Sequence, residues 1–155
     1  FNCLMHKVFF IITVFFLLSN CCYEPIYSSK NINFSIGNIE KVNNSLNNEF
    51  VRLIKSVSNK KTNNTIDIKI DSKKIITIKS KDSKGNPLIY ELKINLEITK
   101  QNENKAENHL ISRKISYKNT DDKFELKKYE SELQKILINK LVEDLIKYLT
   151  NNQWF

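Results

Sequence analysis

Few side chains in this sequence could perform acid–base or nucleophilic chemistry. The two histidines are His6 and His109, and His109 lies next to Asn108 in a polar stretch that we predict to be a loop. A lone loop histidine is usually solvated, and no nucleophile is placed to pair with it. Two carboxylate pairs, Asp121-Asp122 and Glu143-Asp144, are explained by favourable charge at a helix start and by exposure on a helix flank. The sequence therefore predicts a protein that is not an enzyme and has no catalytic residue.

The sequence also has no pattern that would hold a metal or a nucleotide. Its cysteines, histidines and carboxylates do not have the spacing of a zinc or calcium site. The two glycines, Gly37 and Gly85, are isolated, so a glycine-rich phosphate loop cannot form. We expect no metal and no cofactor.

Lysine is the remaining candidate for chemistry. The 155 residues carry 25 Lys and Arg against 17 Asp and Glu, a net charge of +8. AT-rich codon usage would produce this composition without any function, whereas the functional interpretation is an anionic partner such as a phosphorylated lipid headgroup. Ammonium groups pair with phosphate as point charges. The lysines gather at a predicted strand turn and at the start of the last predicted helix: Lys79, Lys81, Lys84, Lys123, Lys127 and Lys128.

A cysteine follows directly after the most apolar segment of the chain. Val8–Leu18 reads VFFIITVFFLL, shorter than the ~20 residues of a transmembrane helix but typical of a signal-peptide core. Leu18-Ser19-Asn20-Cys21 resembles the bacterial lipobox, with Asn20 where Gly or Ala is usual. The resemblance implies that the thiol of Cys21 is acylated and that cleavage occurs just before it. An ordinary secretory signal or an uncleaved anchor is the alternative.

This interpretation divides the chain into a signal peptide (1–20), a lipidated tether (21–31), a folded domain (32–150) and a tail (151–155). Phe1 or Met5 is the first residue of the signal. Each buried acyl methylene contributes ~0.8 kcal/mol, so two or three chains anchor a domain to a bilayer. Cys22 is not Asp, which by resemblance to sorted lipoproteins permits export to the outer membrane. Nucleic acid is then excluded as a partner, because the domain lies outside the cytoplasm.

Alternation of apolar and polar residues predicts four strands, each with one buried face. They run over residues 32–36, 66–81, 88–98 and 111–117. The second is either one long strand or a hairpin around Asp71–Lys74, and we favour the long strand. Lys84–Pro87 is the strongest turn signal, and Lys100–Asn108 is predicted as a solvated loop.

Helical spacing predicts two helices. Asn43-Asn44-Ser45 offers capping oxygens before a first apolar stripe that ends at Val57. Asp122 and Glu125 form an acidic capping box before a helix that we expect to span Lys123–Leu149. A strand, a helix, three strands and a long helix predict an α+β two-layer sandwich, with two helices on one face of a four-stranded, mostly antiparallel sheet.

From Cys21 onward the chain resembles the LPS-assembly lipoprotein LptE family, the outer-membrane partner of the barrel protein LptD. The resemblance rests on Cys21–Tyr27 (CCYEPIY), on Ile89–Leu92 (IYEL) after a turn, and on Ile111–Tyr117 (ISRKISY) before a long helix with Leu145-Ile146 near its end. Cys22 stands where the family usually has Gly. These short motifs occur in the family's order.

The resemblance implies a lipoprotein on the periplasmic face of the outer membrane that plugs an LptD-type β-barrel, assists its assembly and takes part in lipopolysaccharide transport. The family's lipopolysaccharide contacts fall nearest Lys84 and Lys128, and Lys81 is as good a candidate as Lys84. The alternative is a freestanding periplasmic lipoprotein that binds a small hydrophobic ligand or assists envelope assembly elsewhere.

Overall fold

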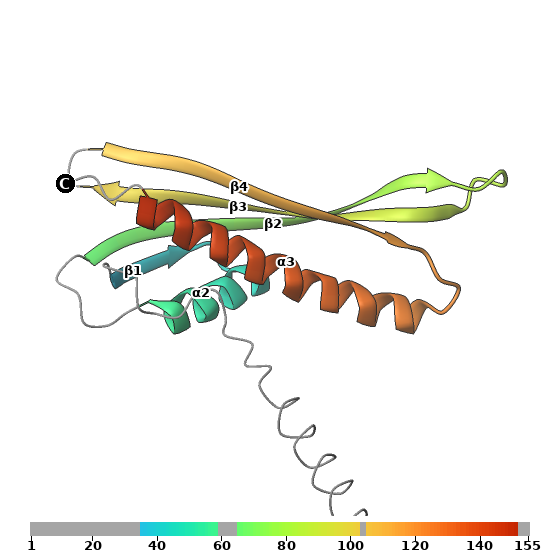
Figure 1. Cartoon of the computed structure of the whole chain (residues 1–155), viewed down its shortest axis with the longest axis horizontal. Helices are drawn as coiled ribbons and strands as arrows, with labels where there is room; N and C mark the ends of the chain where they lie inside the picture. Colours follow the sequence, from blue (N-terminus) through green and yellow to red (C-terminus); the bar gives the residue numbers. More distant parts are fainter. Residues whose placement is uncertain (1–34, 59–64, 103–104, 152–155) are drawn as a thin grey trace, which may run out of the picture. The chain divides into compact units, whose positions relative to one another are not determined.

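The alternating and helical patterns of the sequence form the expected elements in the expected order. The computed structural model describes residues 35–58, 65–102 and 105–151. The elements are β1 (Ser35–Lys41), α2 (Ser45–Val57), β2 (Thr65–Lys81), β3 (Pro87–Asn102), β4 (Lys105–Lys118) and α3 (Lys123–Asn151). Both helices lie on one face of the sheet, which confirms the α+β arrangement (Figure 1).

The sheet has the order β1-β2-β3-β4. β1 pairs with β2 in parallel, while β2–β3 and β3–β4 are antiparallel. Pairing between β2 and β3 runs unbroken through Asp71↔Glu97 and Lys74↔Ile94. The long-strand prediction is therefore confirmed, and the alternative hairpin at Asp71–Lys74 is wrong.

The predicted loop at Lys100–Asn108 is wrong as well. β3 continues to Asn102 and β4 begins at Lys105, so Lys100 pairs with Glu107 and Thr99 pairs with Asn108. Polar residues continue a strand where a neighbouring strand supplies the backbone hydrogen bonds, and strand propensity depends strongly on that context. The first predicted strand (32–36) overlaps β1 at Ser35 and Ile36, and β1 continues to Lys41; Ile32 and Phe34 lie outside the described residues.

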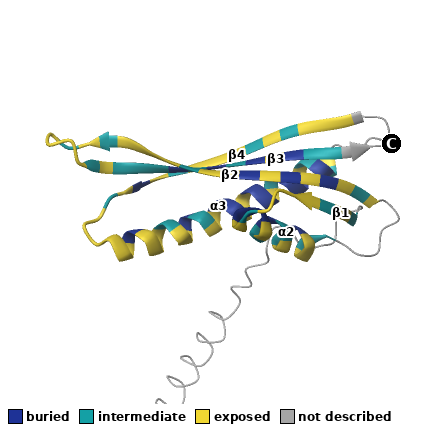
Figure 2. Ribbon diagram, turned by 180° about the vertical axis from the view of Figure 1, so that it is seen from behind, coloured by how far each residue is buried: buried dark blue, intermediate teal, exposed yellow. Residues whose placement is uncertain are grey.

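The core lies between the helices and the sheet. Rows of paired residues cross the helix-facing side, for example Ile70 with Ile98 and Leu96 with Ile111. Figure 2 shows buried positions along the middle of β2, β3 and α3, with exposed positions towards the β2–β3 turn. Burying each large apolar side chain contributes about 1.5–3 kcal/mol. The largest fully buried side chains are Phe50, Ile54, Ile68, Ile70, Leu92, Ile94, Leu96, Ile98, Ile138, Leu141 and Leu145.

Polar side chains fix the start of each helix. The side-chain oxygen of Asn44 accepts a 2.6 Å hydrogen bond from the backbone N–H of Asn47 and so caps α2. Asp122 accepts from Phe124 N–H and Glu125 N–H at 2.8 and 3.1 Å and so caps α3. No helix in the described ranges is sufficiently long and apolar to cross a membrane.

The apolar stripe of α3 is less regular than the sequence suggested. Tyr129 and Ile136 each follow a buried leucine, Leu126 and Leu133, by three positions, which is the spacing of one helical stripe, yet they are 48% and 44% exposed. The reason is that the helix buries the face that carries Leu126, Leu133 and Leu137, while Tyr129 and Ile136 lie on its flank. Tyr129 reaches back only to contact the ring of Tyr117 edge-on, with ring centroids 6.2 Å apart.

Candidate functional site

Two of the candidate lysines lie at the β2–β3 turn. Lys81 ends β2, and Lys84 lies within the turn that connects it to β3. Asp82 N–H donates to Asn86 C=O at 2.8 Å and Gly85 N–H donates to Asp82 C=O at 3.0 Å. Gly85 has φ +85°, which only a residue without Cβ adopts readily. The turn is therefore well defined, and it holds Lys84 at the tip of the sheet.

The one carboxylate in this turn is occupied by the turn itself. Asp82 accepts from the side-chain amide of Asn86 at 3.0 Å and from the backbone N–H groups of Asn86 and Lys84, each at 2.8 Å. The Asn86 side chain, followed by these backbone donors, holds the pKa of Asp82 below its ordinary value. Lys81 and Lys84 are both exposed and take part in none of the ion pairs between described residues. Their charges are thus available to an anion from solution.

Lys128 lies at the same end of the domain but in the helix layer. The segment before α3 is tied to the start of β3, because Asn119 N–H donates to Leu88 C=O at 2.8 Å and the Asn119 amide donates to Pro87 C=O at 2.9 Å. Lys128 follows the buried Leu126 by two positions, which turns it away from the sheet. The three predicted lysines therefore share one end of the domain without forming a single cluster.

A second basic group lies on the face of the sheet that points away from the helices, and of its members the sequence had indicated only Lys79. Glu91 on β3 forms ion pairs with Lys79 on β2 at 3.4 Å and with Lys114 on β4 at 3.3 Å. Lys93 pairs directly opposite Lys114 across the strands. Burial opposes ionisation of Glu91, but the ammonium groups of Lys114 and Lys79 outweigh it and keep its pKa below the ordinary value. Three lysines around one carboxylate leave this surface positive, and only the strand register could have revealed it.

Asp144 is not the solvent-exposed flank residue that the sequence predicted. It accepts two hydrogen bonds from the guanidinium of Arg113, at 2.6 and 2.8 Å, and its side chain is 18% exposed. Arg113 interrupts the apolar positions of β4 and pairs opposite Ile94 on the helix-facing side of the sheet. The pair therefore joins α3 to β4 and has a structural role.

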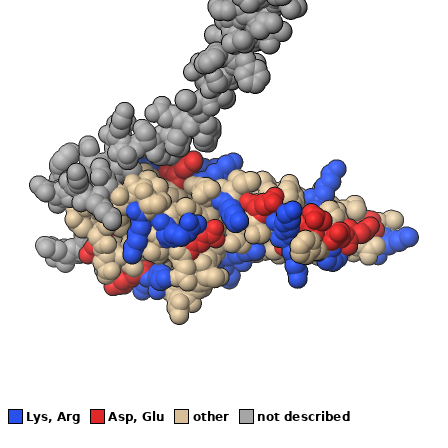
Figure 3. All heavy atoms as spheres, turned by 90° about the horizontal axis from the view of Figure 1, so that it is seen from below, with Lys and Arg blue, Asp and Glu red and all other residues tan. Residues whose placement is uncertain are grey.

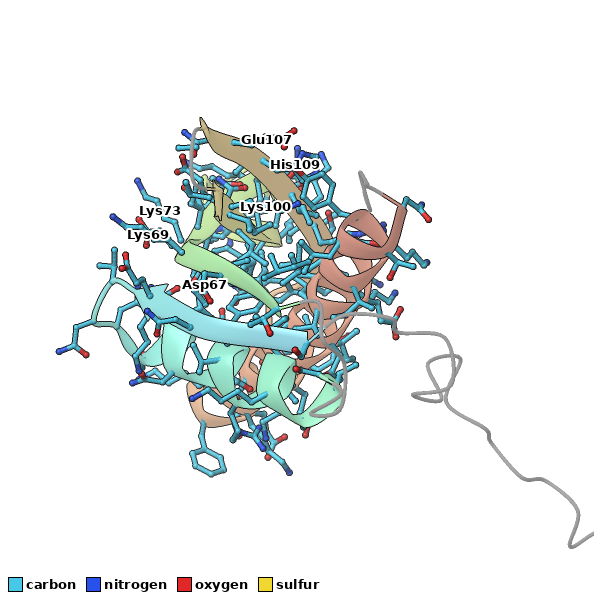
Figure 4. All side chains as sticks on the ribbon, turned by 90° about the vertical axis from the view of Figure 1, so that its left-hand side faces the viewer. Asp67, Lys69, Lys73, Lys100, Glu107 and His109 are labelled. Atoms are coloured by element: carbon cyan, nitrogen blue, oxygen red, sulfur yellow. The ribbon has the colours of Figure 1, made fainter. Side chains whose placement is uncertain are left out.

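His109 is not a loop residue either. It lies within β4 and is half-buried, and its ring stacks on that of Tyr148 of α3 with centroids 3.9 Å apart and planes 1° apart. Figure 4 shows His109 and Glu107 on β4, while Lys69 and Lys73 project from β2 away from both helices. The ring contact makes His109 part of the packing between β4 and α3.

The described residues hold no group of three or more His, Cys, Asp and Glu that could bind a metal ion. Cys21, the predicted site of lipid attachment, lies outside the described residues, as do the signal and tether predictions that depend on it. In the view from below, basic side chains are scattered over the visible face with acidic ones between them, and the other residues make up most of it (Figure 3).

The fold is shared with solved structures of bacterial lipoproteins. A crystal structure of rare lipoprotein B from Shewanella oneidensis matches with a TM-score of 0.60 at 16% sequence identity, over 77% of this chain and 96% of that one. A solution structure of an uncharacterized lipoprotein B from Nitrosomonas europaea matches at 0.55 and 15%, over 78% and 87%. A minor lipoprotein from Acinetobacter baumannii matches at 0.54 and 11%, over 79% and 95%.

At these identities the likeness establishes the fold alone. No protein-family model matches the sequence, and no curated protein is similar to it in sequence. The described domain therefore shares its fold with these bacterial lipoproteins.

Proposed function

We propose that this chain is an outer-membrane lipoprotein of LptE type, anchored through acyl chains on Cys21, that docks in an LptD-type β-barrel and takes part in lipopolysaccharide transport. The observation that carries the proposal is the combination of a lipobox-like segment with a domain whose fold matches known lipoproteins. The family resemblance of the sequence predicted the same order of elements, which the structure has.

The face of the sheet that points away from the helices suits the interior of a barrel. Along β2, residues of this face alternate with the core and are mostly charged or hydroxylated: Asp67, Lys69, Asp71, Lys73, Thr77 and Lys79. The interior of an outer-membrane barrel is polar, whereas its lipid-facing side is apolar. A polar sheet face can contact such a lumen without exposing apolar side chains to water.

The exposed lysines at the turn and on α3 give the domain a means of binding phosphorylated glycolipid. Lys81 and Lys84 extend from a turn whose carboxylate is already bonded, and Lys128 lies at the same end. Ammonium–phosphate pairs at exposed positions weaken as salt rises, because the Debye length falls from ~10 Å at 0.1 M to ~3 Å at 1 M. The glycolipid contact is therefore expected to be salt-sensitive.

Affinity purification of the full chain from detergent-solubilised envelopes tests the barrel partnership. We expect a large outer-membrane β-barrel to co-purify, and mass spectrometry to find Cys21 as an acylated N-terminal residue. An unmodified thiol, or purification without any barrel, would contradict the proposal and favour a freestanding lipoprotein.

A lysine substitution series tests the glycolipid contact separately. The Lys81→Ala/Lys84→Ala/Lys128→Ala variant is expected to lose lipopolysaccharide binding. The matched control, Lys55→Ala/Lys69→Ala/Lys140→Ala, removes the same charge from exposed positions elsewhere and should retain it. Equal binding by both variants would remove the specific lysine contact from the proposal.

A further inference from the structure

β1 pairs with only the first part of β2, so the rest of that sheet edge has no paired strand within the described ranges. The register of β1 on β2 ends at Lys41↔Ile70, and β2 continues to Lys81 (Figure 1). Val42 N–H still reaches the carbonyl of Ile70 at 3.4 Å, and the side-chain amide of Asn44 reaches the carbonyl of Ser72 at 3.4 Å. Within the described ranges, no strand pairs with this edge beyond that point.

The alternation of the backbone shows which groups lie on this open edge. The carbonyls of Ile70 and Ser72 both point towards β1 and α2. Backbone N–H and C=O groups of a strand alternate between its two sides with a period of two residues. The N–H and C=O groups of Lys74, Ile76 and Ile78 therefore point to the same side, where the sheet has no further strand.

The helix layer covers the same segment only in part. α3 reaches it at Lys74, whose ammonium donates to the side-chain oxygen of Gln134 at 2.9 Å. α2 begins beside Ser72, whose hydroxyl donates to the Asn47 side chain at 2.5 Å. It then runs back to Ser58, whose hydroxyl accepts from Ile36 N–H at 3.1 Å. A helix of 13 residues spans ~20 Å, whereas a strand of 17 residues spans ~56 Å. Ile76 and Ile78 point to the helix-facing side but remain 41% and 47% exposed.

The charges of this segment select its occupant. Residues 73–81 read KKIITIKSK, with four lysines and no acidic residue. Lys79 pairs with Glu91 and Lys74 donates to Gln134, whereas Lys73 and Lys81 are exposed and take part in none of the ion pairs between described residues. A second copy of the same edge would place lysines against lysines, and edge lysines are a recognised protection against such pairing. An acyl chain could cover the two isoleucines but would leave the backbone groups unpaired, which is unfavourable once water is excluded. An extended acidic peptide can pair with the open backbone groups, cover the two isoleucines and neutralise the lysines.

We propose that the edge of β2 from Lys73 to Lys81 docks an extended, acidic segment of a partner protein, which joins the sheet beside β2. Its backbone pairs with that of Lys74, Ile76 and Ile78. Its apolar side chains cover the two isoleucines, and its carboxylates face Lys73 and Lys81. Strand addition of this kind draws affinity from main-chain hydrogen bonds and specificity from alternate side chains. The site stands independently of the barrel partnership, because any protein with such a segment could occupy it.

The test uses the full chain in nanodiscs of zwitterionic lipid and a labelled nine-residue peptide that alternates Glu and Val. We expect saturable binding by fluorescence anisotropy and slowed amide hydrogen exchange confined to residues 73–81. A peptide with the same side chains but N-methylated amides, which lacks the donors that strand addition needs, should not bind. Equal binding by the methylated peptide, protection on β4 instead of β2, or no binding would overturn the proposal.

Charge variants separate this site from general attraction to a basic protein. Lys73→Glu/Lys81→Glu is expected to weaken peptide binding about tenfold, as two lost ion pairs of up to ~1 kcal/mol each would give. Lys69→Glu/Lys118→Glu carries the same charge change at exposed positions outside the open edge and should retain binding within about twofold. Equal losses in both variants would contradict the site. Dimerisation through residues 73–81, or their protection by anionic nanodiscs alone, would replace the peptide by a second copy or a lipid surface and overturn the proposal.

Discussion

The two halves of β2 have similar sequence alternation but different surroundings. In the half near β1, Ile68 and Ile70 are 1% and 0% exposed, because α2 covers them. In the half near the turn, Ile76 and Ile78 keep the same alternation and yet are nearly half exposed. Alternation therefore reports which face of a strand a residue occupies, whereas burial depends on whether another element extends that far. The covered half is expected to determine stability, and the uncovered half is available for binding.

The largest expected effect is a loss of unfolding free energy when phenylalanine is replaced by alanine in the covered part of the domain but not at an exposed position. Phe50 on α2 is 0% exposed in the covered half, and Phe124 at the start of α3 is 75% exposed. Phe50→Ala should lower the free energy of unfolding by about 3–5 kcal/mol, because it removes buried apolar surface and leaves a cavity. Phe124→Ala should change it by less than about 0.5 kcal/mol. Urea denaturation measures both, and similar losses would contradict the division.

The second prediction concerns the hydrogen bond between Asn47 of α2 and Ser72 of β2, at the point where α2 stops covering the strand. Asn47 is fully buried; its Oδ1 accepts from the Ser72 hydroxyl, and its Nδ2 donates to the carbonyl of Val42 at 2.8 Å. Asn47→Ala should cost about 1–3 kcal/mol, since buried partners lose their hydrogen bonds. Asn48→Ala, at the exposed neighbouring position, is the control and should cost far less.

The double variant Asn47→Ala/Ser72→Ala sharpens this test. If the two side chains act as a pair, the second substitution should add less than it costs alone, because the hydroxyl left unpaired by the first is also removed. Additive losses in the double-mutant cycle would show that Asn47 stabilises α2 without the contact to β2.

A smaller, pH-dependent effect is expected from the ion pair that joins α3 to β4. The Arg113 guanidinium, through its hydrogen bonds and then its charge, holds the pKa of Asp144 below the ordinary value against the opposing effect of burial. A carboxyl whose pKa is lowered by folding stabilises the fold above its unfolded pKa, and that contribution is lost as pH falls through the folded value. Asp144→Asn should therefore cost about 0.5–1 kcal/mol at neutral pH.

The difference between wild type and Asp144→Asn should shrink as the pH falls below about 4, because protonation removes the same charge from the wild type. Asp82 and Glu91 also have lowered pKa values, but they are present in both proteins and their contributions cancel in the difference. Thermal unfolding across this pH range gives the measurement, with Glu132→Gln as a control at an exposed position of α3. A difference that grows at low pH would contradict the assigned role of the pair.

The sequence predicted the fold well because local patterns determine most of it. Capping by Asn44 and Asp122, the strand alternation and the turn at Lys84–Pro87 all depend on neighbouring residues, and the structure bears them out. The loop predicted at Lys100–Asn108 failed because those polar residues become strand only through pairing with each other. The exposure of Ile76 likewise depends on α2, which is far away in the sequence and too short to cover this residue.

The candidate site was predicted less completely for the same reason. Lys81 and Lys84 were identified because they flank a local turn signal. The group formed by Lys79, Glu91 and Lys114 joins three strands, so its residues meet only once the register is known. Asp144 likewise meets Arg113 through the packing of α3 on β4. Contacts between elements distant in the sequence leave no spacing pattern that a single sequence could show.

The smallest expected effect is the most informative about the uncovered half. Ile78→Thr keeps a β-branched side chain suited to a strand but replaces apolar surface that is already 47% exposed. The free energy of unfolding should therefore change by less than about 0.5 kcal/mol. Ile70→Thr, at the fully buried position of the same strand, should cost several times more, because it buries a hydroxyl and removes core contacts. If Ile78→Thr proved as damaging as Ile70→Thr in urea denaturation, Ile78 would already be covered within the isolated chain, and the open edge of β2 could not serve as a docking site.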